Sequence, residues 1–164
     1  MSLTDYLLDH SDYDWGRILR PWSSLLPAEF TLWMMNRFGD LFLVLPDGSV
    51  QMLDLGGDSL NQLAESRDEF ARRADEDGNA EDWFMIPLVD ELVAAGRVLG
   101  PGQCYGFVTP PILGGDYTVE NTMVLSIIEQ FGLHGSYHEQ LQDVPDGAKI
   151  VLKVCKPPSS ESPR

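Results

Sequence analysis

Positive charge is scarce in this sequence, and long apolar runs are absent. Its 164 residues include 11 lysines and arginines against 26 aspartates and glutamates, a formal net charge of −15, and no lysine precedes Lys149. This net negative charge repels phosphate backbones and anionic lipid, so we expect no direct binding to nucleic acid or to a membrane. No apolar stretch approaches the ~18 residues of a membrane span, and the first residues lack the basic and apolar regions of a signal peptide. We expect a cytoplasmic protein, whose acidity suits a basic partner or serves solubility alone.

Cysteines and the common catalytic motifs are also scarce. Cys104 and Cys155 stand in apolar surroundings without a C-x-x-C pattern, so we expect buried free thiols rather than a disulfide or a nucleophile. The sequence has no G-x-S-x-G, no phosphate-binding P-loop and no G-x-G-x-x-G after a strand. These absences favour a protein that binds over one that catalyses.

Two histidines leave a catalytic alternative open. His134 and His138 are four residues apart and Glu139 follows, but the zinc motif H-E-x-x-H needs its glutamate where Gly135 stands. We therefore predict no metal and no cofactor. The alternatives are a small metal-dependent enzyme, an enzyme pairing Cys104 with a histidine, or a regulatory adaptor protein.

The first forty residues predict helices. Residues 3–10 and 15–19 are expected to form short helical pieces within an N-terminal segment, 1–24, that packs on the main domain at 25–155. Pro27 can open a longer helix over about 28–37, because Phe30, Trp33, Met34 and Phe38 fall at helical spacing before Gly39.

A hairpin is the clearest element of the sequence. DLFLVLPDGSVQMLDL predicts strands at 41–45 and 50–54 around a turn at Asp47-Gly48, with Val50, Met52 and Asp54 on one face of the second strand.

The rest of the chain predicts alternating helices and strands. Asp58 or Ser59 can begin a short helix, and Ser66 with Glu69 forms a capping box for a helix reaching Ala74. The next expectations are a helix over about 81–95 kinked or split at Pro87 and a strand at 103–109. After them we expect a short apolar strand or helix start, a broken helix, a helix containing His138 to Gln142, a strand at 149–154 and a disordered tail at 156–164. Together they predict a single-domain α+β fold with one mainly antiparallel twisted sheet and helices packed against it.

The stretch GQCYGFVTPPILGGDYTVEN, residues 102–121, reads as a strand that runs into a shaped loop. Two prolines stop the strand, and Gly114-Gly115 permit a tight turn. No residue in the stretch activates a nucleophile, and Asp116 and Glu120 disfavour a phosphate site at the glycines.

Acidic side chains are concentrated between residues 65 and 91. Ten of them face three arginines there, a local balance of −7, which can steer a basic partner or be a solvated face. The run DEDGNAED is not an EF-hand, because placing Gly78 sixth puts Arg73 first and Phe84 twelfth. The candidate partner-binding residues are Asp75, Glu76, Asp77, Glu81, Asp82, Asp116 and Tyr117.

Residues 25–154 resemble the C-terminal domain of bacterial type VI secretion DNase-immunity proteins, a domain formerly of unknown function. The resemblance is carried by Gly39-Asp40-Leu41-Phe42 and by the block from Gly102-Gln103-Cys104-Tyr105 to Leu113-Gly114-Gly115. It implies an α+β domain similar to the broad Smi/Knr-like immunity class, without enzymatic activity. It also implies a protein toxin, such as a nuclease, as the cognate partner that the protein binds and neutralises. The acidic composition adds the expectation that this toxin is basic.

Overall fold

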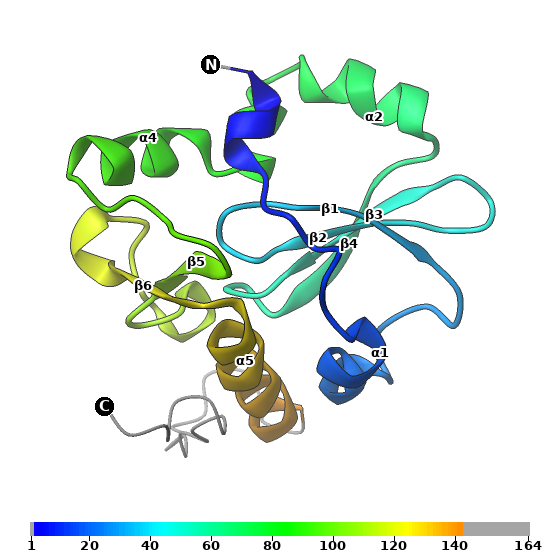
Figure 1. Ribbon diagram of the computed structural model, residues 1–164. Coiled ribbons are helices and arrows are strands. Elements are labelled where there is room, and N and C mark those ends of the chain that lie inside the picture. Colours follow the sequence, from blue (N-terminus) through cyan, green and yellow to red (C-terminus); the bar gives the residue numbers. More distant parts are fainter. Residues whose placement is uncertain (1, 143–164) are drawn as a thin grey trace.

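The computed structural model describes residues 2–142, so the predicted strand at 149–154, Cys155 and the predicted tail at 156–164 lie outside the described residues. Figure 1 shows a central sheet with α2 on one side and α1 and α5 on the other. In chain order, with η for a 3₁₀ turn, the elements are η1 (Leu3–Tyr6), α1 (Trp15–Ile18), η2 (Arg20–Trp22), β1 (Thr31–Met35), β2 (Leu41–Val44), β3 (Val50–Asp54), β4 (Ser59–Ala64), α2 (Arg67–Ala74), α3 (Asn79–Trp83), α4 (Ile86–Ala94), β5 (Gln103–Phe107), η3 (Pro111–Leu113), η4 (Val119–Asn121), β6 (Thr122–Ser126) and α5 (Ile127–Leu141).

The predicted hairpin forms the centre of the larger sheet. β2 and β3 pair in antiparallel register, and Gly48 takes the positive φ of +90° that closes the turn between them. Asp47 stabilises that turn, because its Oδ1 accepts hydrogen bonds from the Ser49 backbone N–H at 2.9 Å and from the Ser49 hydroxyl at 2.6 Å. β1 and β4 complete the sheet in the order β1-β2-β3-β4.

Both faces of this sheet are buried, which explains why β2 is apolar at every position. Side chains alternate between the faces of a strand, so Phe42 and Leu43 enter different clusters. Phe42 packs with Phe70 of α2 and Phe84, while Leu43 lies in the cluster that contains Trp22 and Phe131 of α5. The fold is therefore a sheet between two layers of helices and turns.

A second, two-stranded antiparallel sheet is made by β5 and β6. The α+β class and the antiparallel strands are confirmed, but the expectation of one sheet is wrong. β5 meets the end of β1 through a backbone hydrogen bond from Tyr105 N–H to the Arg37 carbonyl at 2.8 Å rather than through a ladder. The buried Gln130 side chain joins the two sheets by donating from Nε2 to the carbonyls of Phe38 at 2.9 Å and Tyr105 at 3.3 Å.

The helix expected over 28–37 is wrong, because Thr31–Met35 is strand β1. The register of β1 against β2 shifts between Leu32 and Met34. Such a bulge moves the inward-facing positions by one residue, which makes an apolar strand resemble a helix in its spacing. The expected stop at Gly39 is nonetheless a tight turn, with φ +86°.

Two further expectations are corrected. Asp58 and Ser59 do not begin a helix: Asp58 has φ +50° in the turn between two strands, and Ser59 starts β4. Gly135 does not break α5, which is continuous through this position. An added Cβ at Gly135 would lie 2.9 Å from the Pro21 ring, so the glycine allows η2 to pack closely against the helix.

Several helix predictions are confirmed. α2 begins after Ser66, whose hydroxyl accepts from Glu69 N–H at 3.0 Å, and it ends at Ala74. The other half of the predicted capping box is displaced by one residue, because Glu69 Oε1 accepts from the Glu65 N–H at 3.0 Å. The stretch around Pro87 is split into α3 and α4, separated by Met85 at φ +55°. The short helical piece predicted at 15–19 appears as α1, and the one predicted at 3–10 appears as η1 only up to Tyr6, because Leu7 forms an antiparallel bridge with Asn36. Among residues 2–142, no helix is long and apolar enough to cross a bilayer.

Candidate functional site

A cleft of about 480 Å³ lies between the sheet, the helices α3 and α4, and the chain around β5. We call it the acidic cleft, because five of its twelve lining residues are acidic and none is basic. Its acidic members are Asp40, Asp54, Glu81, Asp82 and Glu91, and its other members are Met52, Trp83, Met85, Pro87, Leu88, Phe107 and Tyr117. The volume falls in the range of ligand-binding sites, roughly 300–1,000 Å³.

The floor of the acidic cleft is formed by side chains on one face of β3. Met52 and Asp54 are two residues apart on β3, so both side chains project to the same face, as the sequence predicted. The wall opposite comes from the junction of α3 and α4, where the left-handed conformation of Met85 turns the chain and brings Trp83 and Leu88 to the opening.

Asp40 is the most buried acid of the cleft, with only 5% of its surface exposed. Its Oδ1 accepts from the Leu55 backbone N–H at 2.9 Å, and its Oδ2 accepts from the Asn36 side-chain Nδ2 at 2.9 Å. Asn36 Nδ2 also donates to the Trp83 carbonyl at 3.0 Å, so one amide links the cleft's acidic floor to its helical wall. The carboxyl group is held in one orientation.

Burial, and after it the charge of Asp54, raise the pKa of Asp40 from its ordinary 3.8 to about 7, against the hydrogen bonds from Asn36 and from the Leu55 N–H, which lower it. Burial also raises the pKa of Asp54, against hydrogen bonds from the backbone N–H groups of Gly57 and Gly56 that lower it. The two acids are therefore held where negative charge is costly and where a nearby cation would be favourable.

The loop after β5 borders the cleft and is held in shape by one side chain. Asn121 Oδ1 accepts from Thr109 N–H at 2.9 Å, while its Nδ2 donates to the carbonyls of Thr109 at 2.9 Å and Asp116 at 2.8 Å. Gly115 is required inside this loop, because a Cβ there would collide with the Thr109 carbonyl oxygen. The prediction of a strand running into a shaped loop is confirmed.

Tyr117 projects from this loop beside the cleft. Its ring packs edge-on against Phe107 at 5.3 Å between centroids, and 56% of its surface is exposed. Tyr117 is thus a partly exposed aromatic side chain next to acidic groups, on a loop whose backbone is held by the hydrogen bonds of Asn121.

The structure brings together three of the seven candidate partner-binding residues, namely Glu81, Asp82 and Tyr117. Asp75, Glu76 and Asp77 are exposed at and beyond the C-terminal end of α2 and do not line the cleft. Asp116 is exposed on the braced loop. Sequence reasoning missed Asp40, and it missed Asp54 as a site residue; the only signal was Asp54's place on the Met52 face of the hairpin.

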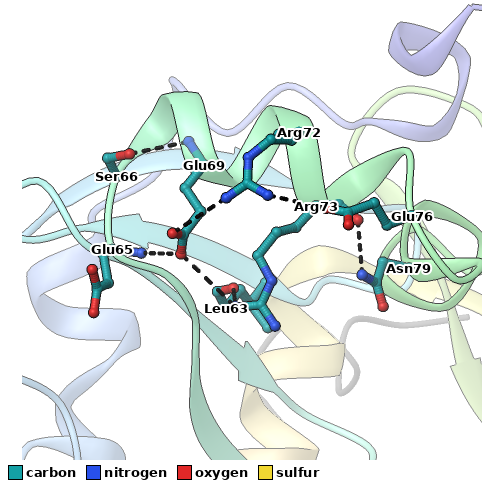
Figure 2. Close-up of polar contacts among 8 residues, drawn as sticks. All are labelled: Leu63, Glu65, Ser66, Glu69, Arg72, Arg73, Glu76 and Asn79. Atoms are coloured by element: carbon teal, nitrogen blue, oxygen red, sulfur yellow. Dashed lines mark hydrogen bonds and ion pairs between the residues drawn. The ribbon is translucent and has the colours of Figure 1, made fainter.

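The arginines of the acidic stretch are already engaged within the protein, as Figure 2 shows for α2. Arg72 lies between Glu69 at 3.6 Å and Glu76 at 3.5 Å, and Arg73 donates to the Leu63 carbonyl at 2.9 Å. The guanidinium of Arg67 lies 5.8 Å from the centre of the Trp33 ring. Because Glu69 and Glu76 share Arg72, the free acidic charge near this helix is carried by its other acids, Asp75 and Asp77 among them.

The residues of the catalytic alternative do not form an activated site. Cys104 is buried, as predicted, and burial raises the pKa of its thiol, so the thiolate that a nucleophile needs is disfavoured. His138 Nδ1 lies 2.7 Å from Asp58 Oδ1, and burial lowers the pKa of His134 to about 4. Within residues 2–142 no group of three or more His, Cys, Asp or Glu side chains could hold a metal ion. The absence of a metal stays a prediction for the whole chain.

Residues 64–138 match the model of a family described as "T6SS immunity protein Tdi1, C-terminal". This match confirms the resemblance to type VI secretion immunity proteins over that segment; the wider Smi/Knr-like class is not part of the description. The segment contains α3, α4 and Tyr117, and Asp40, Met52 and Asp54 precede it. No curated protein matches the sequence.

Proposed function

We propose that this protein is a cytoplasmic immunity protein that binds a secreted antibacterial effector and neutralises it by direct contact, without a catalytic step of its own. The observation that carries the proposal is the acidic cleft beside the exposed Tyr117, whose helical wall and loop, but not its floor, lie in the segment that matches an immunity family. The burial of Cys104, which disfavours its thiolate, supports a binding role over an enzymatic one.

The apolar walls of the cleft, but not its acidic side chains, have the composition of a protein interface. Interface centres are rich in Trp, Tyr and Met, and affinity concentrates in a few aromatic anchors that enter or fill pockets. Trp83, Met85 and Tyr117 meet at this opening. Because Asn121 already holds the loop that carries Tyr117, binding would not need to order that loop, which reduces the entropic cost of association.

The charge of the protein suits a basic effector, and we propose a nuclease. A nuclease surface that contacts nucleic acid must be rich in Lys and Arg to neutralise phosphates. A protein with net charge −15 attracts such a surface over a distance, and the same charge keeps it away from nucleic acid. Covering the basic surface of the effector would block its substrate.

The direct test is co-expression with the effector encoded next to this gene. We expect the protein to form a complex with that effector on size exclusion and to rescue the growth of cells that produce it. A variant with an unrelated sequence at 110–117, in which Gly114 and Gly115 are kept because the loop backbone requires them, serves as the control for specificity, provided that its circular dichroism spectrum is unchanged. Failure of the wild-type protein to form the complex or to protect cells would refute the proposal for that pair.

A further inference from the structure

We infer that the acidic cleft receives an arginine side chain of the partner, with the guanidinium at Asp40 and Asp54 and the aliphatic stem against the apolar walls. This inference rests on the proposed function for the source of the arginine. The recognition chemistry itself follows from the cleft and can be tested without the effector.

Charge gives the first reason. Two acids, Asp40 and Asp54, lie on the floor of the cleft, three more stand on its helical rim, and no basic side chain lines it. Protein interiors rarely hold acids away from water without a cation near them, because burial disfavours the charged form. Neither floor acid forms an ion pair within residues 2–142, where the ion pairs involve Glu69, Glu76 and Asp58. A cation from a binding partner would supply the positive charge that Asp40 and Asp54 lack within the described residues.

The walls select among cations. Trp83, Phe107 and Tyr117 place aromatic rings around the acids, and Met52 and Met85 add flexible apolar surface. A guanidinium is planar, weakly hydrated, stacks on aromatic rings and donates in a fork that matches a carboxylate, whereas an ammonium is compact and strongly hydrated. Long aliphatic stems pack against apolar surface while the charged end finds its partner. The cleft therefore fits arginine better than lysine.

Other occupants fit less well. A phosphate-bearing ligand would be repelled by five acids, and a divalent cation would need a set of ligands that no three His, Cys, Asp or Glu side chains of residues 2–142 provide. A dry apolar peptide would leave the floor acids unpaired.

The first experiment uses the protein alone, with N-acetyl-arginine amide as the probe and N-acetyl-citrulline amide as its uncharged isostere. Titrations are followed by the NMR signals of the Trp83 indole and of the Met52 and Met85 methyl groups. We expect saturable shifts of these signals with the arginine probe, at least tenfold weaker binding of the citrulline probe, and loss of that preference in Asp54→Asn. No saturable shift, or equal binding of both probes, would overturn the inference.

The second experiment uses the complex with the effector and measures its dissociation constant. We expect Asp54→Asn to weaken binding tenfold or more. Glu91→Gln, on an exposed rim residue that cannot unfold the core, should weaken it about threefold. The matched controls are Asp12→Asn and Glu120→Gln, both exposed and outside the cleft lining, which should leave affinity within twofold.

The outcomes separate the two ideas. If the wild-type protein forms no complex, the proposed function fails for that effector, whatever the probe titration shows. If the complex forms and both cleft variants bind as tightly as the controls, the immunity function stands and the arginine inference is wrong. If they bind more weakly than the controls, and replacing one effector arginine by alanine abolishes the difference between wild type and Asp54→Asn, the inference is supported.

Discussion

Asp54→Asn should make the free protein more stable, and the gain should be larger at pH 8 than at pH 5. The substitution removes one of two acids that share a buried floor, while an asparagine oxygen can still accept the hydrogen bond that Gly57 N–H donates at 3.1 Å. A site adapted to receive a cation is strained when empty, and the variant relieves that strain.

The magnitude follows from Asp40, whose pKa is about 7 in the folded protein against an ordinary 3.8. An acid whose folded-state pKa is raised contributes stability that is complete below its unfolded pKa and is lost as pH rises through the folded pKa. A difference of about 3 pH units corresponds to about 4 kcal/mol lost between pH 4 and pH 8. Burial is the larger cause and persists in the variant, so we expect Asp54→Asn to recover about 1 kcal/mol at pH 8 and much less at pH 5.

His134 acts with the opposite sign and must be separated from this effect. Burial lowers its pKa from 6.5 to about 4, so its contribution is complete above pH 6.5 and is lost as pH falls towards 4. That change is about 3 kcal/mol and opposes the Asp40 change over the same range. The pH profile of the wild type alone is therefore flattened, and the informative quantity is the difference between variant and wild type.

Urea unfolding followed by tryptophan fluorescence at pH 5, 6, 7 and 8 measures this difference. The free energy of unfolding of Asp54→Asn minus that of wild type should rise with pH, while the same difference for the exposed Asp12→Asn should stay flat. A difference that does not change with pH, or a loss of stability at pH 8, would show that Asp54 does not raise the pKa of Asp40 in solution.

Three other predictions concern the loop, the acidic stretch and the metal. Asn121→Ala removes three hydrogen bonds to backbone groups, so amide exchange at Thr109 should accelerate at least tenfold and stability should fall by about 1–3 kcal/mol, measured by hydrogen exchange and urea unfolding. Replacing Asp75 and Asp77 by Asn should slow association with a basic effector severalfold at low salt and leave dissociation unchanged; stopped-flow rates that ignore both salt and the substitutions would contradict steering. Purified protein should contain no stoichiometric zinc by elemental analysis, and zinc that His138→Ala removes would restore the enzymatic alternative.

Local signals were enough to predict some elements and failed where the decisive contact is distant. The hairpin of β2 and β3 carries its own turn residues and apolar pattern, and α2 carries its own cap at Ser66, so both were predictable. β1 was mistaken for a helix because its bulge at Leu32–Met34 exists only through pairing with β2. β4 was missed for a similar reason: Asn61 and Gln62 are exposed at a sheet edge and give the strand little apolar signal.

The candidate site likewise has parts that were visible in the local sequence and parts that depend on distant contacts. The acidic run was visible in the sequence, and so was Tyr117 beside the double glycine. The floor of the cleft was not, because Asp40 and Asp54 meet Trp83 and Tyr117 only after the sheet, the helices and the loop have packed together. The role of Asn36, which binds Asp40 and the Trp83 carbonyl with one amide, depends on atoms 47 residues apart in sequence.

The hydrogen bonds of Asn121, which act as a clamp on the loop, determine which positions of that loop can vary. Its three hydrogen bonds go to main-chain atoms of Thr109 and Asp116, so the clamp is blind to the side chains between them apart from Gly115, which must stay small. Ile112, which is 49% exposed, can be exchanged without loosening the frame, whereas Gly114, with φ +93°, must also stay a glycine. Side chains at such positions of the loop can therefore differ while the core and the cleft floor stay as they are, and under the proposed function such differences would alter the contacts with an effector.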